Sequence, residues 1–119
     1  MLPAGASAQR FAWWRDADIQ QELQLTPGQI TDIERAQQES LEGRRSLRQE
    51  LERADAEMAR ALERGDLDDA TALELVTRVE TIRMRSNVAR SLVLARMYRV
   101  LSPEQRRLLS ALRERAVRN

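Results

Sequence analysis

Leu25-Thr26-Pro27-Gly28-Gln29 near the start of the chain returns near its end as Leu101-Ser102-Pro103-Glu104-Gln105. In both stretches a hydroxyl residue suits the N-cap of a helix, and the proline after it suits the first helical position. The glutamine three residues after the cap completes a capping box. We therefore predict that each stretch starts a helix, with structural cap positions at Leu25, Thr26, Gln29, Leu101, Ser102 and Gln105.

Two long helices are expected between these motifs. From Pro27 to about Arg64 the one helix breaker is Gly43, and apolar residues recur every three or four positions, as in an amphipathic helix. Gly65 can end this helix in the left-handed conformation. Asp66 can cap a second helix, which we expect from about Leu67 to Val100.

The connection at Gly65 is so short that it favours an antiparallel hairpin. With the turn centred after Gly65, facing residues have numbers that sum to about 131, so the two motifs meet at the open end. Shorter helices from Asp16 to about Leu23 and from Pro103 to about Val117 are expected to cover that end, including the wide apolar face after Val88.

The predicted fold class is therefore all-α: a long antiparallel helical hairpin with short flanking N- and C-terminal helices. Residues 13–119 form the single predicted domain. Residues 1–12 are interpreted as a disordered or post-signal tail, because Ala6-Ser7-Ala8 resembles a signal-peptidase site. A thin apolar stripe on elongated helices also predicts a homodimer.

The composition argues against several classes of function. The 119 residues include no cysteine and no histidine, and the net charge is only +1. We therefore predict no enzyme activity, no cofactor, no metal site and no nucleic-acid partner. No apolar run is long enough for a transmembrane segment. Three methionines at helical spacing are interpreted as core residues: Met58, Met84 and Met97.

The arginines are the candidate functional residues. All twenty basic residues are arginine. Two groups fall at the same level of the expected hairpin, and they are either a solvated surface or a basic band that holds unfolded chains beside small apolar patches. The residues of this candidate client-binding band are Arg44, Arg45, Arg48, Arg83, Arg85 and Arg90.

Trp13 and Trp14 also have two interpretations. At least one of them is expected in the core, at the end of the hairpin where the motifs meet. The other is either a second core residue or a partly exposed binding anchor.

The order of these features resembles the LTxxQ-motif family of periplasmic proteins, which includes the Spy/CpxP chaperones and related heavy-metal-resistance sensors. Trp-Trp, Leu-Thr-Pro-Gly-Gln, a long charged helix, a Gly-Asp turn, a second long helix and Val-Leu-Ser-Pro-Glu-Gln come one after another over roughly residues 13–112.

This resemblance implies a cradle-like homodimer in the periplasm, tethered to the membrane if an upstream anchor exists. It implies ATP-independent binding of unfolded or misfolded envelope proteins on a basic, partly apolar face, or the damping of a sensor kinase. The metal-sensing branch uses histidines, which this chain lacks. A metal-responsive sensor and a structural coiled-coil module are the alternatives.

Overall fold

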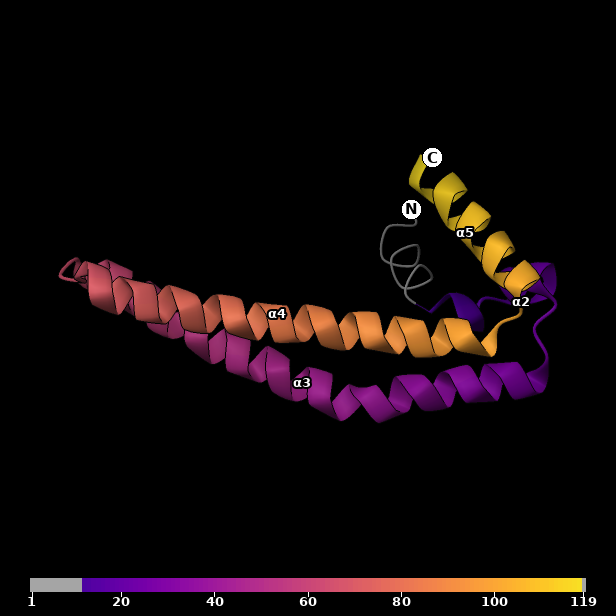
Figure 1. The fold of residues 1–119 in the computed structure, drawn as a ribbon, viewed down its shortest axis with the longest axis horizontal. Helices are drawn as coiled ribbons and strands as arrows, with labels where there is room; N and C mark the ends of the chain where they lie inside the picture. Colours follow the sequence, from indigo (N-terminus) through magenta and orange to yellow (C-terminus); the bar gives the residue numbers. More distant parts are fainter. Residues whose placement is uncertain (1–11, 119) are drawn as a thin grey trace. The chain divides into compact units, whose positions relative to one another are not determined.

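The computed structural model describes residues 12–118, and every regular element in that range is helical. In chain order these are a short 3-10 helix η1 (Trp13–Arg15), then α2 (Ala17–Leu23), α3 (Pro27–Arg64), α4 (Asp69–Val100) and α5 (Pro103–Arg118) (Figure 1). The predicted all-α fold class is confirmed. The predicted tail, residues 1–12, lies outside the described residues except for Ala12.

The chain divides into two compact units, and each of the long helices contributes to both. The first unit contains the chain up to Gln37 together with the chain from Ala95 onward. The second unit runs from Gln38 to Leu94 and contains the turn between α3 and α4. Each unit has buried apolar side chains of its own.

Both predicted capping boxes are present in the first unit. At the start of α3, Gln29 N–H donates to Thr26 Oγ1 at 3.0 Å, and Thr26 N–H donates to Gln29 Oε1 at 3.1 Å. At the start of α5, Gln105 N–H donates to Ser102 Oγ at 3.1 Å, and Ser102 N–H donates to Gln105 Oε1 at 2.8 Å. The two motifs therefore start their helices as the sequence predicts.

Asp16 caps α2, also as predicted. Its Oδ1 accepts from the N–H groups of Asp18 at 2.8 Å and Ile19 at 3.2 Å. The helix ends one residue before Gln24, whose left-handed conformation (φ 54°) stops further helical hydrogen bonding.

The core of the first unit is built around the aromatic residues. Trp13 and Trp14 are 3% and 2% exposed, and their rings meet edge to face at 5.6 Å. Tyr98 adds a second edge-to-face contact with Trp13 at 6.4 Å. The interpretation of one tryptophan as an exposed anchor is therefore wrong. Other buried members of this core come from α2, α3, α4, the link after α4, and α5: Leu23, Ile33, Met97, Leu101 and Leu109.

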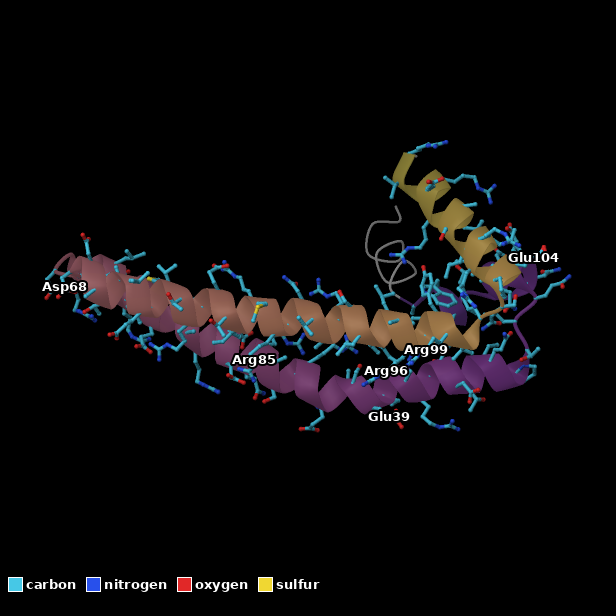
Figure 2. All side chains as sticks on the ribbon, viewed as in Figure 1. Glu39, Asp68, Arg85, Arg96, Arg99 and Glu104 are labelled. Atoms are coloured by element: carbon cyan, nitrogen blue, oxygen red, sulfur yellow. The ribbon has the colours of Figure 1, made fainter. Side chains whose placement is uncertain are left out.

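In the second unit α3 and α4 run antiparallel from the turn at Gly65, whose φ of +74° confirms its left-handed role. The cap of α4 is Asp68 rather than the predicted Asp66, and the helix begins at Asp69 rather than Leu67. Thr71 N–H donates to Asp68 Oδ1 at 2.8 Å, and this bond lowers the pKa of Asp68 (Figure 2).

The longer turn also changes the predicted register. Ion pairs join Glu50 to Arg85 and Glu57 to Arg78 across the two helices. Their residue numbers sum to 135, and those of a third pair, Asp55 and Arg83, sum to 138. Residues of α3 therefore pair with positions further along α4 than the predicted sum of 131 gives.

The core of the second unit is thin. One cluster in it consists of Leu47, Ala54, Val79 and Ile82, with Leu51 and Ala89 packed against them. Ala61, Leu75 and Val93 of this unit are buried as well. The prediction that Met84 is a core residue is wrong, since it is 57% exposed. It lies two positions after Ile82, which turns its side chain about 200° around the helix. Leu62, placed on the apolar stripe by its spacing, is 65% exposed.

Candidate functional site

A depression of about 480 Å³ lies between α3 and α4 in the second unit. Its lining includes five of the six arginines predicted as the client-binding band, and we call it the arginine depression. Its residues are Leu41, Arg44, Arg45, Arg48 and Leu51 from α3 and Arg83, Ser86, Asn87 and Arg90 from α4.

Arg85, the sixth predicted residue, does not line the arginine depression. Its Nη1 donates to Glu50 Oε1 at 3.2 Å, on the facing helix (Figure 2). Arg83 lines the depression but is also neutralised, because it lies 2.7 Å from Glu80 and 3.7 Å from Asp55. The two arginines therefore stabilise the helix pair in part.

The other four arginines of the depression have no carboxylate partner. Within residues 12–118, no ion pair shorter than 4.0 Å involves Arg44, Arg45, Arg48 or Arg90. Arg44 is half-buried and donates through Nε to Ser40 Oγ at 3.1 Å. Its Nη2 is buried and has no hydrogen-bond partner.

This arrangement attracts anions. Among residues 12–118 the lining contains five guanidinium groups and no carboxylate, and the positive potentials of the four that form no ion pair add. The apolar walls at Leu41 and Leu51 reduce screening by water. Guanidinium groups present planar pairs of donors that match carboxylate and phosphate oxygens. The depression is thus chemically suited to bind a negatively charged group.

An exposed apolar strip borders the arginine depression on α4. Met84, Val88 and Leu92 recur every four residues and are 57%, 52% and 51% exposed. They line a shallow hollow of about 550 Å³ whose lining includes Arg83 and Asn87, and both residues also line the arginine depression. The prediction that other helices cover the apolar face after Val88 is therefore wrong for Val88 and Leu92.

In the first unit the motif glutamines bind each other. The amide nitrogen Nε2 of Gln29 donates to Gln105 Oε1 at 2.8 Å and to the carbonyl of Val100 at 3.2 Å. Nε2 of Gln105 donates to Gln29 Oε1 at 3.1 Å and to the carbonyl of Leu23 at 3.0 Å. Each amide also accepts from a cap N–H.

Because each side-chain amide has two N–H donors, both glutamines use their full donor capacity within the protein. This glutamine pair leaves no donor for a ligand and is structural. The sequence placed the two glutamines at the same end of the hairpin but did not reveal the bond between them. Their equal positions in the two motifs were the one available signal.

A second polar contact in the first unit was not predicted. Glu34 accepts from Trp14 Nε1 at 2.9 Å and from Arg15 at 2.6 and 2.9 Å. The bond from Arg15, with a smaller contribution from Trp14, lowers the pKa of Glu34 below its ordinary value of 4.5. The partners are 19 and 20 residues apart, so no local pattern indicates them.

Residues 12–118 contain no candidate membrane-spanning helix and no candidate metal-binding group of side chains. No helix there is both long and apolar enough to cross a bilayer. No three histidine, cysteine, aspartate or glutamate side chains there come close enough together to hold a metal ion.

Comparison with known proteins gave one result. A family model described as LTXXQ motif family protein matches residues 12–113, a range that includes both Leu-(Thr/Ser)-Pro-x-Gln motifs. Neither the curated proteins nor the solved structures gave a match.

Proposed function

The chain belongs to the LTXXQ motif family, and on that premise we propose that it is an ATP-independent chaperone or stress adaptor of the bacterial periplasm. Membership supports a chaperone-like or stress-related role in general. The finer proposal is that the chain holds unfolded or misfolded envelope proteins on the arginine depression and the apolar strip, without a cofactor and without enzyme activity.

This proposal rests on one observation: the arginine depression and the apolar strip border each other. Four unpaired guanidinium groups attract acidic segments over a distance of about one Debye length, roughly 8 Å at physiological salt. Met84, Val88 and Leu92 then offer small apolar contacts beside them. Unfolded chains carry both acidic and apolar side chains, so they can use both surfaces at once.

The same physics allows release without nucleotide hydrolysis. Exposed charge pairs contribute about 1 kcal/mol or less each, and a strip of three half-exposed side chains buries little area. Such contacts are weak enough to exchange. A client that folds buries its apolar side chains and loses its affinity for the strip.

We also propose that the working form is a homodimer. The apolar residues left exposed on α4 extend beyond the strip to Leu73 and Val76, which are 68% and 46% exposed. A second copy can cover part of this face. Light scattering on the purified chain tests this proposal, and a mass equal to one chain at all concentrations would exclude it.

The chaperone proposal is tested by aggregation of a chemically denatured client, measured by turbidity with the protein near stoichiometry. We expect suppression at low salt and a weaker effect in the charge-reversed variant Arg45→Glu/Arg48→Glu. The matched control is Arg96→Glu/Arg99→Glu, which reverses two exposed charges of the first unit (Figure 2). No suppression by the wild-type chain at low salt excludes the chaperone role.

A variant of the apolar strip tests whether the strip holds clients. Val88→Ser/Leu92→Ser keeps the charge and removes apolar surface. We expect it to lose suppression of aggregation, because a holding surface needs apolar contact. If this variant suppresses aggregation as the wild-type chain does, charge alone carries the effect and the apolar strip is not part of the client-binding surface.

A further inference from the structure

Within the described residues, the guanidinium group of Arg44 has a hydrogen-bond partner for one nitrogen and none for another. Its Nε is fixed by Ser40 Oγ at 3.1 Å, which sets the plane of the guanidinium group. Its Nη2 is buried and lacks any acceptor. A buried charged donor without a partner destabilises a fold. Arg44 also lines the arginine depression, so an anion that enters the depression meets this guanidinium group.

The positive charges of the neighbouring arginines are not balanced by carboxylates of the described residues either. Arg45, Arg48 and Arg90 line the same depression without a carboxylate partner in residues 12–118. Four like charges in a space of about 480 Å³ repel one another. Ser86 and Asn87 add neutral groups that can donate hydrogen bonds to an anion. Arg45, Arg48 and Arg90 are exposed, so a ligand that complements these charges is compact and carries several negative charges.

We propose that the arginine depression is a binding site for a small multivalent phosphate anion, such as a di- or triphosphate. Each phosphate group carries about one to two negative charges near neutral pH and several acceptor oxygens. Two or three linked groups thus approach the charge of four arginines. Arginines reach the depression from both α3 and α4, which suits tetrahedral groups with acceptors on all sides better than a planar carboxylate.

The lining also indicates which part of a phosphate compound is recognised. Among residues 12–118 no aromatic side chain lines the depression, so a nucleotide base finds no ring there on which to stack. The site therefore binds the phosphate chain itself. Inorganic triphosphate should bind at least as tightly as ATP.

This inference goes beyond the client-binding proposal, because it concerns a small anion and is tested without any client. Isothermal titration calorimetry on the full chain, at low and at physiological salt, measures the binding of sodium tripolyphosphate. We expect one site per chain. We expect the apparent melting temperature to rise with the ligand, because the ligand binds the folded state alone.

Two charge-matched variants make the test specific. Arg44→Gln/Arg48→Gln removes two charges from the depression and should weaken binding by about tenfold or more, because charge-assisted hydrogen bonds are lost. Arg96→Gln/Arg99→Gln removes two exposed charges of the first unit and should change the affinity by less than about twofold. Circular dichroism shows that both variants stay helical.

Three results would overturn the proposal. The first is the absence of saturable heat and of a thermal shift with tripolyphosphate. The second is an equal loss of affinity in both variants, which would mean that net charge alone acts. The third is tighter binding of ATP, or of a glutamate-rich peptide, than of tripolyphosphate at the same salt, which would assign the site to a nucleotide or to an acidic polypeptide.

Discussion

The two units differ in how fully their polar side chains are paired within the protein. In the first unit Gln29 and Gln105 satisfy each other and the ends of four helices, and Glu34 binds Trp14 and Arg15. In the second unit, within the described residues, Arg44 keeps a buried donor without an acceptor, and Arg45, Arg48 and Arg90 have no carboxylate partner.

The two units also differ in how fully they bury their apolar side chains. The first unit buries both tryptophans and leaves Ile33 with no exposed surface. The described buried side chains of the second unit are small or medium aliphatic ones, while Met84, Val88 and Leu92 stay exposed. Side chains whose hydrogen bonds and apolar contacts are all made within the protein have a structural role. We propose that another molecule binds where such contacts are not made within the protein. The family's sequence motif therefore lies in the structural unit, and the candidate site lies in the other one.

The largest expected effect is the loss of core packing in the first unit. Ile33→Ala should lower the free energy of unfolding by about 3 kcal/mol, because it removes a fully buried side chain and leaves a cavity. Both tryptophans lie in this unit, so their fluorescence in a denaturant titration reports its unfolding. Leu47→Ala in the thinner core should lower the free energy of unfolding, measured by circular dichroism, by about 2 kcal/mol. An equal loss in the two variants would remove the contrast between the cores.

The next effect concerns the glutamine pair. Gln105→Ala should lower the free energy of unfolding by about 2 kcal/mol, because it leaves Gln29 and the carbonyl of Leu23 without a partner. Tryptophan fluorescence in denaturant measures it. Gln21→Ala, at an exposed position of α2 in the same unit, is the control and should stay within about 0.5 kcal/mol. If the two variants behave alike, the glutamine pair does not stabilise the first unit.

A change of opposite sign is expected at Arg44. Arg44→Gln should raise the free energy of unfolding of the second unit by about 1 kcal/mol, because it removes the buried Nη2 donor, which has no acceptor in residues 12–118. Circular dichroism or hydrogen exchange is the measurement, since the second unit has no tryptophan. Arg48→Gln, at an exposed position, is the matched control and should have little effect. A loss of stability in Arg44→Gln would show that this guanidinium is structural.

The smallest effect is a pH dependence in the first unit. The pKa of Glu34 is lower in the folded chain than in the unfolded chain, mainly because Arg15 donates to it. Its contribution to stability is therefore present above pH 4.5 and is lost as the pH falls through the lower folded value.

Because the pair is partly exposed, we expect this contribution to be below about 1 kcal/mol. Melting curves recorded by tryptophan fluorescence between neutral and acidic pH measure it. Glu34→Gln should flatten the profile, whereas Glu39→Gln should not. A wild-type profile that matches that of Glu34→Gln would contradict this assignment.

Most helix boundaries could be predicted because capping is local chemistry. A cap side chain binds an N–H two or three residues away, so the roles of Asp16, Thr26 and Ser102 could be inferred from their neighbours. The turn after α3 was predicted two residues too short, since Asp66 and Asp68 are equally good caps by type. The choice between them sets the register of the second unit.

Side-chain partners across helices were less predictable. Arg83 and Arg85 look equivalent in the sequence. Because they are two positions apart on one helix, their side chains point in different directions, Arg83 toward the depression and Arg85 toward Glu50. Glu34 gave no signal at all, because its partners are about 20 residues away. Exposure of Met84 could have been predicted from its angle to Ile82 on the same helix.

The sequence by itself determined the all-α class, the bounds of α3, the caps of three helices and the region of the arginines, because these depend on helical periodicity and on contacts within one turn. The tertiary structure decided the bond between Gln29 and Gln105, the partners of Glu34 and which arginines stay unpaired. Those outcomes depend on the turn length and on the angle at which two helices present each residue. Neither quantity is fixed by any short stretch of the chain.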